Sequence, residues 1–356
     1  MAGREGHLDL KRMRPSFFHH LHPPTIPARQ ARLRYTLGAG GLSVYLVLVL
    51  TITGILEMFY YVPTPQEAGA SIQTITYLVP YGAILRNLHF WAAQALVIVA
   101  VVHMLRVIFT GAYVPPRRFN YLLGLALLVL SLFLDFTGYV LRWDEGIRWA
   151  LVAGTNLIKA IPWVGPGLYV FVMGSSQPGP AALTRFYTWH IFGLMIVLIG
   201  IGVWHIFRVR RDGGIAAPPP ELRREARRIT RFELVRREGL ATIVATVALL
   251  LLAIFIPAPL APAMTEVSPQ VGDTRAPWFF LWVQQLLRLG DAFWMGVVFP
   301  LMILVFIALI PYLFSLPQPG ELGEWFPPGA RLAQVAGAIV ALFLLILTMI
   351  ALQSTG

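Results

Sequence analysis

Seven long apolar segments constrain this chain more than any other feature of its sequence. They cover about residues 36–60, 85–111, 120–141, 186–209, 239–257, 292–314 and 333–352. Each is long enough to cross the hydrocarbon core of a bilayer, about 30 Å thick, as a helix. A backbone in lipid must satisfy its own hydrogen bonds, which apolar segments of this length do as helices. The sequence therefore predicts an all-α polytopic membrane protein with seven spans.

The composition agrees with this class and excludes several kinds of site. Of 356 residues, 57% are hydrophobic and only 13% are charged, as in polytopic membrane proteins. The chain has no cysteine, so it holds no disulfide, no cysteine-bound iron-sulfur cluster and no covalently attached c-type haem. The polar first 35 residues do not resemble a signal peptide, and we expect them to stay in the cytoplasm.

Lysine and arginine are distributed unequally between the two predicted sides. Alternate loops carry 21 of the 28 basic residues on the side of the N-terminus and 7 on the other. This bias places the N-terminus inside and the C-terminus outside. We interpret the net charge of +11 as a collar that faces anionic lipid, not as a surface for nucleic acid.

The chain divides into two hydrophobic blocks. An Arg-rich stretch, 221–238, follows Pro218-Pro219-Pro220 and is expected to form a short helix on the membrane surface. The predicted parts are a cytoplasmic basic N-terminal segment (1–35), a four-helix bundle (36–211), a cytoplasmic Arg-rich linker (212–238) and a three-helix C-terminal domain (239–356).

Two histidine pairs lie inside the apolar segments of the first block. His89 and His103 are 14 residues apart, and His190 and His205 are 15 apart. At 1.5 Å rise per residue, either spacing is about 21 Å, so each pair occupies one helix face near opposite membrane surfaces. The topology puts His89 and His190 at the outer level and His103 and His205 at the inner level. Imidazole is an axial ligand of haem iron, and an ionisable group at membrane depth suggests a function.

Glycines on the two neighbouring spans occur at the same levels. Gly40 and Gly54 are 14 residues apart, as are Gly124 and Gly138, and glycine lets a backbone approach a flat ring closely. A single membrane histidine is often a packing residue. Four histidines and four glycines in matching register instead favour two haems, one above the other, each held by two histidines.

Several motifs of the first block resemble the cytochrome b/b6 subunits of quinol-oxidising complexes of the bc1 and b6f type. They are Phe59-Tyr60-Tyr61, Arg86 before His89, His103-Met104-Leu105-Arg106-Val107, Thr137-Gly138-Tyr139 with Trp143-Asp144, Thr155-Asn156-Leu157 with Ala160-Ile161-Pro162, and Leu183-Thr184-Arg185-Phe186-Tyr187. The unequal histidine spacings resemble the b6 branch, and the second block is similar to its subunit IV. Both blocks stand here in one chain, which suggests a bacterial plasma membrane.

The resemblance implies the di-haem subunit of a quinol:electron-acceptor oxidoreductase. It implies two non-covalent b-type haems, menaquinone or a similar quinone, a Rieske iron-sulfur protein, a c-type cytochrome subunit and a homodimer within the complex. Quinol would be oxidised near the outer face, with one electron crossing the haems and protons released outside. The additional covalent haem of the b6 branch is not expected, because Gly38 stands where that branch has a cysteine.

Five arginines lie near the predicted haem levels. Arg86 and Arg185 are at the outer level, and Arg106, Arg208 and Arg210 are at the inner level. Each could pair with haem propionates. For Arg208 and Arg210, contact with lipid phosphate is an equal alternative.

The predicted outer quinol pocket departs from the family pattern. Its expected residues are Tyr139, Trp143, Asp144, Asn156, Pro277 and Trp278. Where the family usually has Pro-Glu-Trp-Tyr, this chain has Ala276-Pro277-Trp278-Phe279, so the proton-accepting glutamate is missing. We expect Glu57, Asp135 or Asp144 to replace it in the proton route. The alternative for these carboxylates is a structural ion pair with Arg142 or Arg86.

Two other functions stay open on the sequence alone. One is a di-haem membrane anchor of another quinone-linked redox enzyme that does not bifurcate electrons, which the missing glutamate favours. The other is a transporter or assembly protein whose histidines pack or relay protons and bind no haem.

Overall fold

The computed structural model describes residues 25–28, 32–147, 150–177, 179–212, 214, 228–264 and 275–353. Most of the predicted N-terminal segment and the centre of the predicted linker lie outside the described residues.

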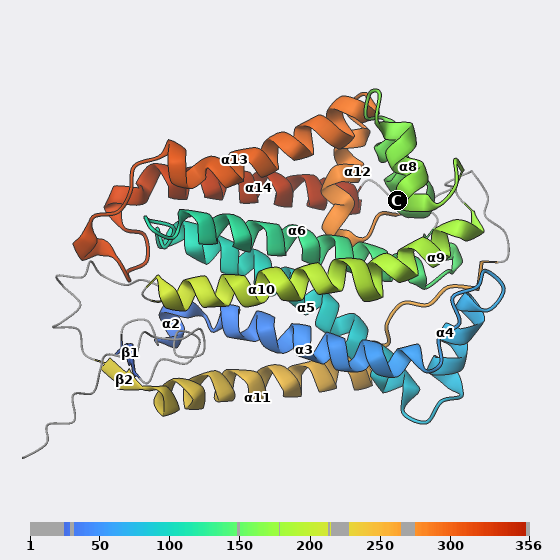
Figure 1. Cartoon of the computed structure of the whole chain (residues 1–356), viewed down its shortest axis with the longest axis horizontal. Helices are drawn as coiled ribbons and strands as arrows, with labels where there is room; N and C mark the ends of the chain where they lie inside the picture. The colour runs from blue at the N-terminus through green and yellow to red at the C-terminus, as the bar shows by residue number, and fades with distance from the viewer. Residues whose placement is uncertain are drawn as a thin grey trace, which may run out of the picture.

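Seven long apolar helices run side by side through the described part of the chain (Figure 1). They are α3 (Ala39–Met58), α5 (Gly82–Phe109), α6 (Arg118–Leu141), α9 with α10 (Pro180–Thr188 and Leu194–Arg211), α11 (Arg231–Phe255), α13 (Phe299–Leu313) and α14 (Arg331–Gln353). A π-helical turn joins α9 to α10 (Trp189–Gly193), and another precedes α13 (Trp294–Val298). The prediction of an all-α protein with seven spans is confirmed.

Two helices begin earlier than the hydrophobic pattern predicts. The fourth begins at Pro180, and proline is well suited to a first helical turn because its missing N–H needs no partner there. The fifth begins at Arg231, where the Thr230 hydroxyl accepts a hydrogen bond from the Glu233 N–H at 3.4 Å. Residues 231–238 are therefore the first turns of α11, and the prediction that they belong to a separate surface helix is wrong.

Short elements complete the two ends of the bundle. They are α2 (Leu33–Thr36), α4 (Ala68–Tyr77), α7 (Thr155–Lys159), α8 (Gly165–Met173), α12 (Leu281–Leu287), and the antiparallel strands β1 (Thr25–Pro27) and β2 (Arg228–Thr230). In Figure 1, α4 and α8 lie at one end, where α14 also finishes, and β1, β2 and α2 lie at the other. We call these the outer and inner ends, following the topology that the basic residues predict.

The seven helices are not arranged as one four-helix group beside one three-helix group. Helices α3, α5, α6 and α10 pack in that order, while α11 packs against α3 and α5. Helices α13 and α14 lie on the opposite side, against α6 and α5 respectively (Figure 1). The four-helix unit is therefore covered by the second block on two sides.

Polar side chains fix α11 to its neighbours within the apolar belt. The Tyr45 hydroxyl lies 2.6 Å from the Thr246 hydroxyl, and the Asn87 amide donates to the Ala253 carbonyl at 2.8 Å. The side-chain carbonyl of Asn87 also accepts from the Ala258 N–H at 2.9 Å. Interhelical hydrogen bonds in membranes are worth about 0.6 kcal/mol on average, so together they locate this helix against the bundle.

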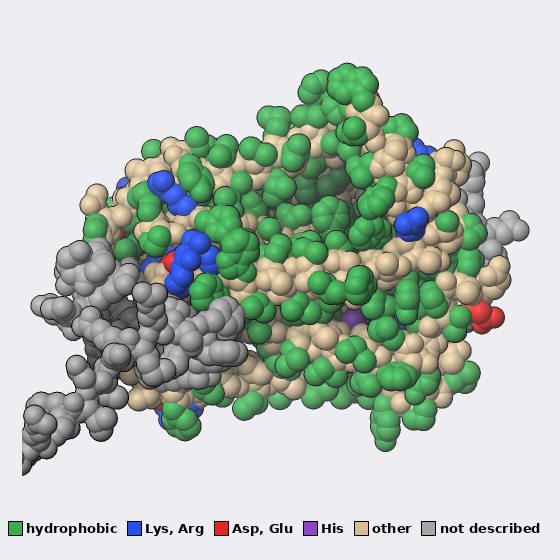
Figure 2. Space-filling model, in the orientation of Figure 1, with side chains coloured by type: hydrophobic (Ala, Val, Ile, Leu, Met, Phe, Trp, Pro, Cys, Tyr) green, Lys and Arg blue, Asp and Glu red, His purple; other side chains and the backbone are tan. Residues whose placement is uncertain are grey.

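The surface has the pattern that a bilayer requires. Hydrophobic side chains cover the middle of the face in Figure 2, and most charged side chains visible there lie toward the two ends. Large apolar side chains such as Ile196, Leu251 and Ile339 are more than half exposed. In lipid such exposure costs nothing, because the surrounding acyl chains are as apolar as the side chains. The protein is a multi-pass membrane protein.

Candidate cofactor and quinol sites

The two outer histidines face each other across the bundle. His89 is on α5 and His190 is in the π-helical turn before α10, and their ring centroids are 6.5 Å apart with an angle of 67° between the planes. A metal-bound imidazole nitrogen lies about 2 Å from the metal, so two imidazoles on opposite sides of one metal have centroids about 6 Å apart. The separation fits one iron between the two rings.

Hydrogen bonds to backbone carbonyls fix the tautomer of two of the four histidines. His190 Nδ1 lies 3.0 Å from the Leu134 carbonyl, and His205 Nδ1 lies 3.1 Å from the Asn120 carbonyl. A carbonyl only accepts, so each Nδ1 carries the proton and leaves the Nε2 lone pair free to bind a metal. Edge-to-face packing of two rings occurs at similar distances, and a free Nε2 lone pair is what a metal site requires in addition.

A threonine holds each outer histidine in the same way. The Thr53 hydroxyl donates to the Val49 carbonyl at 2.8 Å, so it accepts from His89 Nδ1, also at 2.8 Å. The Thr137 hydroxyl lies 3.0 Å from His190 Nδ1. Thr53 was missed by the sequence reasoning, although the repeated Thr-Gly pair at 53–54 and 137–138 was a usable signal.

Each of the four glycines lies against one histidine ring. A Cβ atom added at Gly54 would lie 3.2 Å from His89 Cε1, and one at Gly138 would lie 2.8 Å from His190 Cε1. At the inner level, Gly40 lies against His103 and Gly124 against His205, with corresponding distances of 3.3 and 3.2 Å. These distances are shorter than normal carbon contacts, so any larger residue would push the imidazole away.

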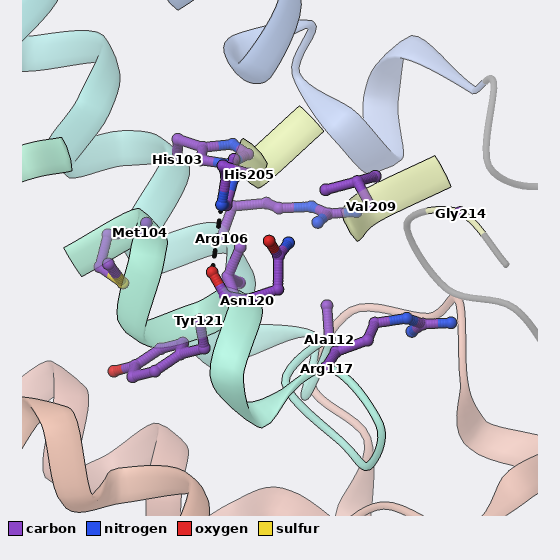
Figure 3. A pocket seen from close by; sticks show the side chains of 12 residues that line it. His103, Met104, Arg106, Ala112, Arg117, Asn120, Tyr121, His205, Val209 and Gly214 are labelled. Carbon is purple, nitrogen blue, oxygen red and sulfur yellow. Dashed lines mark hydrogen bonds between the residues drawn. The ribbon is translucent and has the colours of Figure 1, made fainter. Parts of the chain in front are cut away.

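The inner histidines line a cavity with basic and polar neighbours (Figure 3). Its lining includes Arg106, Asn120 and Gly124 besides His103 and His205. Arg106 is only 2% exposed, and its Nε donates to the Tyr35 carbonyl at 3.1 Å. Among the described residues, one terminal nitrogen of Arg106 and the Asn120 side-chain oxygen have no hydrogen-bond partner. A buried guanidinium with a free donor suits an anionic group such as a carboxylate.

The described residues at either level do not form a complete protein site for a bare metal ion. No cluster of three or more His, Cys, Asp or Glu side chains with metal-binding geometry occurs in the described ranges. Two imidazoles on opposite sides of an iron therefore suit a cofactor that supplies the other ligands itself, as a porphyrin does. The residues present fit a haem at the outer level, and the cavity and glycines fit one at the inner level.

The other inner arginines contact protein groups. Arg208 Nη2 lies 3.3 Å from Asp212 Oδ2, and its guanidinium lies over the Phe119 ring at 5.0 Å from the ring centroid. Arg210, also on α10, is within electrostatic range of Glu238 on α11.

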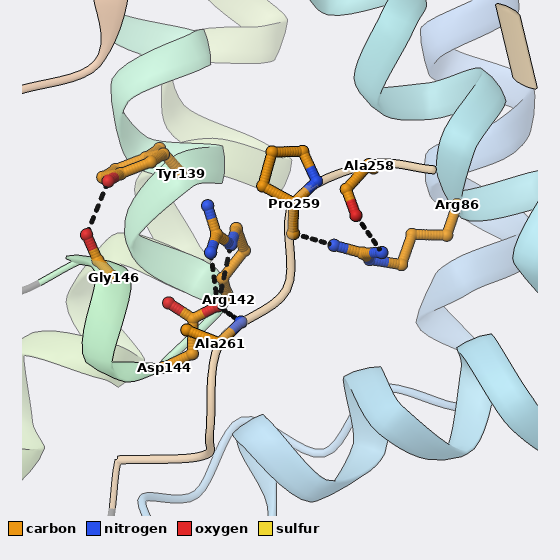
Figure 4. Close-up of polar contacts among 8 residues, drawn as sticks. All are labelled: Arg86, Tyr139, Arg142, Asp144, Gly146, Ala258, Pro259 and Ala261. Carbon is orange, nitrogen blue, oxygen red and sulfur yellow. Dashed lines mark hydrogen bonds and ion pairs between the residues drawn. The ribbon is translucent and has the colours of Figure 1, made fainter. Parts of the chain in front are cut away.

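At the outer end, Arg86 is bound by the loop after α11 (Figure 4). It is 7% exposed and donates to the carbonyls of Ala258 at 3.2 Å and Pro259 at 2.5 Å. Arg185 is instead exposed and packs against Gly174, at the end of α8.

An ion pair at the end of α6 is hydrogen-bonded to the same loop (Figure 4). Arg142 Nη2 lies 2.5 Å from Asp144 Oδ2, which also accepts from the Ala261 N–H at 3.1 Å. The Tyr139 hydroxyl donates to the Gly146 carbonyl at 2.6 Å. Asp144 is therefore the carboxylate that forms a structural ion pair with Arg142.

The two other carboxylates have different surroundings. Asp135 accepts from the Gln94 amide at 3.2 and 3.3 Å, and the Trp278 indole N–H donates to the carbonyl of the same amide at 2.6 Å. Glu57 has a buried oxygen without a hydrogen-bond partner among the described residues and is within electrostatic range of Arg86.

The remaining predicted pocket residues lie in or beside the outer core. Trp143 is 1% exposed and packs with Val140, Leu151 and Met264. The side-chain oxygen of Asn156 is buried, with no partner among the described residues. Pro277 directly precedes a 3₁₀ turn, Trp278–Phe280, which leads into α12.

The comparisons with known proteins assign the family. Residues 94–269 match the sequence model described as cytochrome b(N-terminal)/b6/petB. The cytochrome b6 of Heliobacterium modesticaldum is 38% identical over 192 residues, which are 54% of this chain and 88% of that protein. The chain belongs to the cytochrome b/b6 family.

Other relatives of this cytochrome b/b6 chain come from Geobacillus thermodenitrificans and Trichodesmium erythraeum. The menaquinol:cytochrome c reductase cytochrome b subunit of Geobacillus thermodenitrificans is 33% identical over 49% of this chain and 78% of its own length. The cytochrome b6 of Trichodesmium erythraeum is 35% identical over the same shares. A chain of a hyperthermophilic respiratory Complex III has the same fold, with a TM-score of 0.71, 20% identity and coverage of 90% of this chain and 92% of that one.

Proposed function

We propose that this chain is the di-haem cytochrome b subunit of a quinol-oxidising electron-transfer complex. One b-type haem would be held by His89 and His190, and a second by His103 and His205. The 6.5 Å separation of the outer rings carries the proposal, because it suits one iron with two axial imidazoles. Family membership supports the cofactor.

The side chains around the haems would orient the ligands and balance charge. Bound haem would supply one-electron transfer between ferric and ferrous iron. Thr53 and Thr137 bind the outer imidazoles at Nδ1, which would leave each Nε2 free to hold the iron. Arg106 would donate to a propionate at the inner level, and the glycines let the imidazoles stand close to the neighbouring backbones.

The quinol site is proposed at the outer end, between the end of α6 and the segment before α12. Tyr139, Trp143, Asn156, Pro277 and Trp278 would form or support its walls. Glu57, Asp135 or Asp144 would accept a proton from quinol in place of the missing glutamate. Menaquinone is the proposed quinone, since a relative is named a menaquinol:cytochrome c reductase subunit.

The proposed partners follow from the same relative and from the chemistry. Quinol gives up two electrons, whereas a haem accepts one. A Rieske iron-sulfur protein and a c-type cytochrome subunit would take the other electron, and protons would leave at the outer face. A homodimer in a bacterial inner membrane, in contact with anionic lipid, is the proposed assembly.

A membrane anchor without electron bifurcation is the second candidate, and Pro277 favours it. Proline cannot accept a proton, so the proton-accepting glutamate that the family usually has at the outer site is missing. Purification of the native complex distinguishes the two functions. Rieske and c-type cytochrome subunits that co-purify support bifurcation, whereas a dehydrogenase subunit in their place supports an anchor.

Haem content and quinol reactivity test the principal proposal. A pyridine haemochrome assay on the purified chain should give two b-type haems per polypeptide, and quinol should reduce them in the complex. Inhibition of the Rieske partner should then prevent outer-site reduction of the haems. A haem-free chain would refute the proposal and support the transporter or assembly role.

A further inference from the structure

A hydrogen-bonded series of three side chains links the segment before α12 to the core of the four-helix unit. The Trp278 indole donates to Gln94 Oε1 at 2.6 Å, and Gln94 Nε2 lies 3.2 and 3.3 Å from the two oxygens of Asp135. Trp278 precedes α12, Gln94 is on α5 and Asp135 is on α6. The hydrogen-bonded series therefore joins three elements that are distant in sequence.

In this hydrogen-bonded series, each donor meets an acceptor. An indole N–H only donates, so it selects the carbonyl oxygen of Gln94. The amide nitrogen is then directed at Asp135, whose carboxylate accepts. One orientation of the amide satisfies both contacts, which makes Gln94 a rigid connector between Trp278 and Asp135.

Asp135 differs from the other two candidate carboxylates in its charge environment. Asp144 is paired with Arg142 and also accepts from a backbone N–H. Glu57 is within electrostatic range of Arg86. Within the described ranges, Asp135 has no cation at salt-bridge distance, so no fixed charge competes with a proton for its oxygens.

Other titratable groups at the outer level do not hydrogen-bond to Asp135 among the described residues. They are Glu57 on α3, Arg86 and His89 on α5, Arg142 at the end of α6, and His190 in the turn before α10. The neutral amide of Gln94 is the partner that sets the position of the carboxylate.

The segment that carries Trp278 borders an open surface. Trp278 is 42% exposed, whereas Gln94 is 8% exposed. Figure 2 shows that the hydrophobic surface is hollowed where Figure 1 has α12, between α13 and α10. The Trp278–Phe280 turn leads directly into α12, so a flat apolar ligand in this hollow would lie close to that turn.

We propose that Asp135 is the carboxylate that accepts a quinol proton at the outer site, with Gln94 and Trp278 as its positioning residues. This inference rests on the proposed function and selects one of its three candidate carboxylates. One O–H bond of quinol breaks and its proton forms an O–H bond with Asp135, while the proton of the second O–H bond passes to water at the outer face. One electron would reduce the ferric haem and the other the oxidised iron-sulfur centre of the partner, and Asp135 would later release its proton outward.

Substitutions in the intact complex test the assignment. Asp135→Asn should lower the rate of quinol oxidation on the order of 100-fold, the usual scale for loss of a general base, while haem content and spectra stay as in the wild type. Asp135→Glu should restore part of the rate. Infrared difference spectra recorded on quinol oxidation should contain a protonated-carboxyl band that Asp135→Asn removes.

The positioning residues have a matched control. Trp278→Phe and Gln94→Met should lower the rate of quinol oxidation and shift the carboxyl band, because each substitution removes one contact of the hydrogen-bonded series. Trp282→Phe should do neither, since the Trp282 indole donates to the Phe279 carbonyl within its own segment.

The failure of this inference is distinguishable from failure of the proposed function. If wild-type complex oxidises quinol and Asp135→Asn retains both its rate and the carboxyl band, Asp135 is not the acceptor, whereas the di-haem function stands. Loss of the band in Glu57→Gln or Asp144→Asn instead would assign the role to that residue and overturn the inference. A wild-type chain that binds no haem would refute the proposed function itself.

Discussion

The Tyr121 hydroxyl donates to the Ile307 carbonyl at 2.8 Å, and Ile307 stands four residues before Pro311 in α13. Proline has no N–H, so it leaves the carbonyl four residues earlier without its helical donor. In a membrane an unsatisfied carbonyl is costly. A tyrosine on α6 therefore supplies the hydrogen bond that α13 lacks, and the two blocks of the chain are joined at this point.

Removing that hydroxyl should weaken the contact between α6 and α13. We expect Tyr121→Phe to lower the free energy of unfolding by about 1 kcal/mol, the scale of one interhelical hydrogen bond in a membrane protein. Thermal unfolding in lipid nanodiscs measures the change. Tyr60→Phe is the control, because Tyr60 is 46% exposed; an equal loss in both variants would contradict the explanation.

Alanine at Gly138 should disturb the outer haem selectively. Its Cβ would lie 2.8 Å from His190 Cε1, so the ring must leave its position opposite His89. We expect Gly138→Ala to lose most of the outer-haem absorbance and to retain the inner haem. Gly200→Ala on α10, whose added Cβ would have no atom within 4 Å, should keep both haems.

Loss of the Thr53 hydroxyl should raise the midpoint potential of the outer haem. A hydrogen bond accepted from His89 Nδ1–H makes the imidazole more basic and stabilises ferric iron, so Thr53→Val should favour the ferrous form. Thr51→Val is the control, because the Thr51 hydroxyl bonds only to the Val47 carbonyl in the described structure. Redox titration of both variants checks the prediction, and a potential lowered or unchanged in Thr53→Val would count against it.

Replacing Arg106 should act on the inner haem with the opposite sign. Arg106→Gln removes a buried positive charge beside His103 and His205, and positive charge favours the reduced iron. We expect the inner-haem potential to fall while the outer one stays within measurement error. If both potentials shift equally, the arginine acts through general stability and not through its local charge.

Regular features of the fold were predictable because helices follow simple arithmetic. Apolar segments of span length indicated seven helices, and a spacing of 14 residues along two neighbouring spans brought Gly40 and Gly54 to the levels of His103 and His89. Such inferences need only the helical rise and an alternation of direction.

Contacts between distant segments were not predictable in this way. The bond between Trp278 and Gln94 joins residues 184 positions apart, and no periodicity encodes it. Arg86 was expected beside a propionate, but its observed partners are backbone carbonyls of Ala258 and Pro259, which carry no side-chain signal in the sequence. The start of α11 was missed because its first turns are rich in arginine, whereas a capping threonine determined the boundary.

The opposite placement of α11 and α12 around the four-helix unit has a consequence for assembly. The described part of the connection that directly follows α11, residues 256–264, accepts hydrogen bonds from Arg86 and donates one to Asp144. One short stretch of backbone therefore ties the second block both to α5 and to the end of α6. Any event that breaks these contacts would separate the second block from the four-helix unit at the end where the quinol site is proposed.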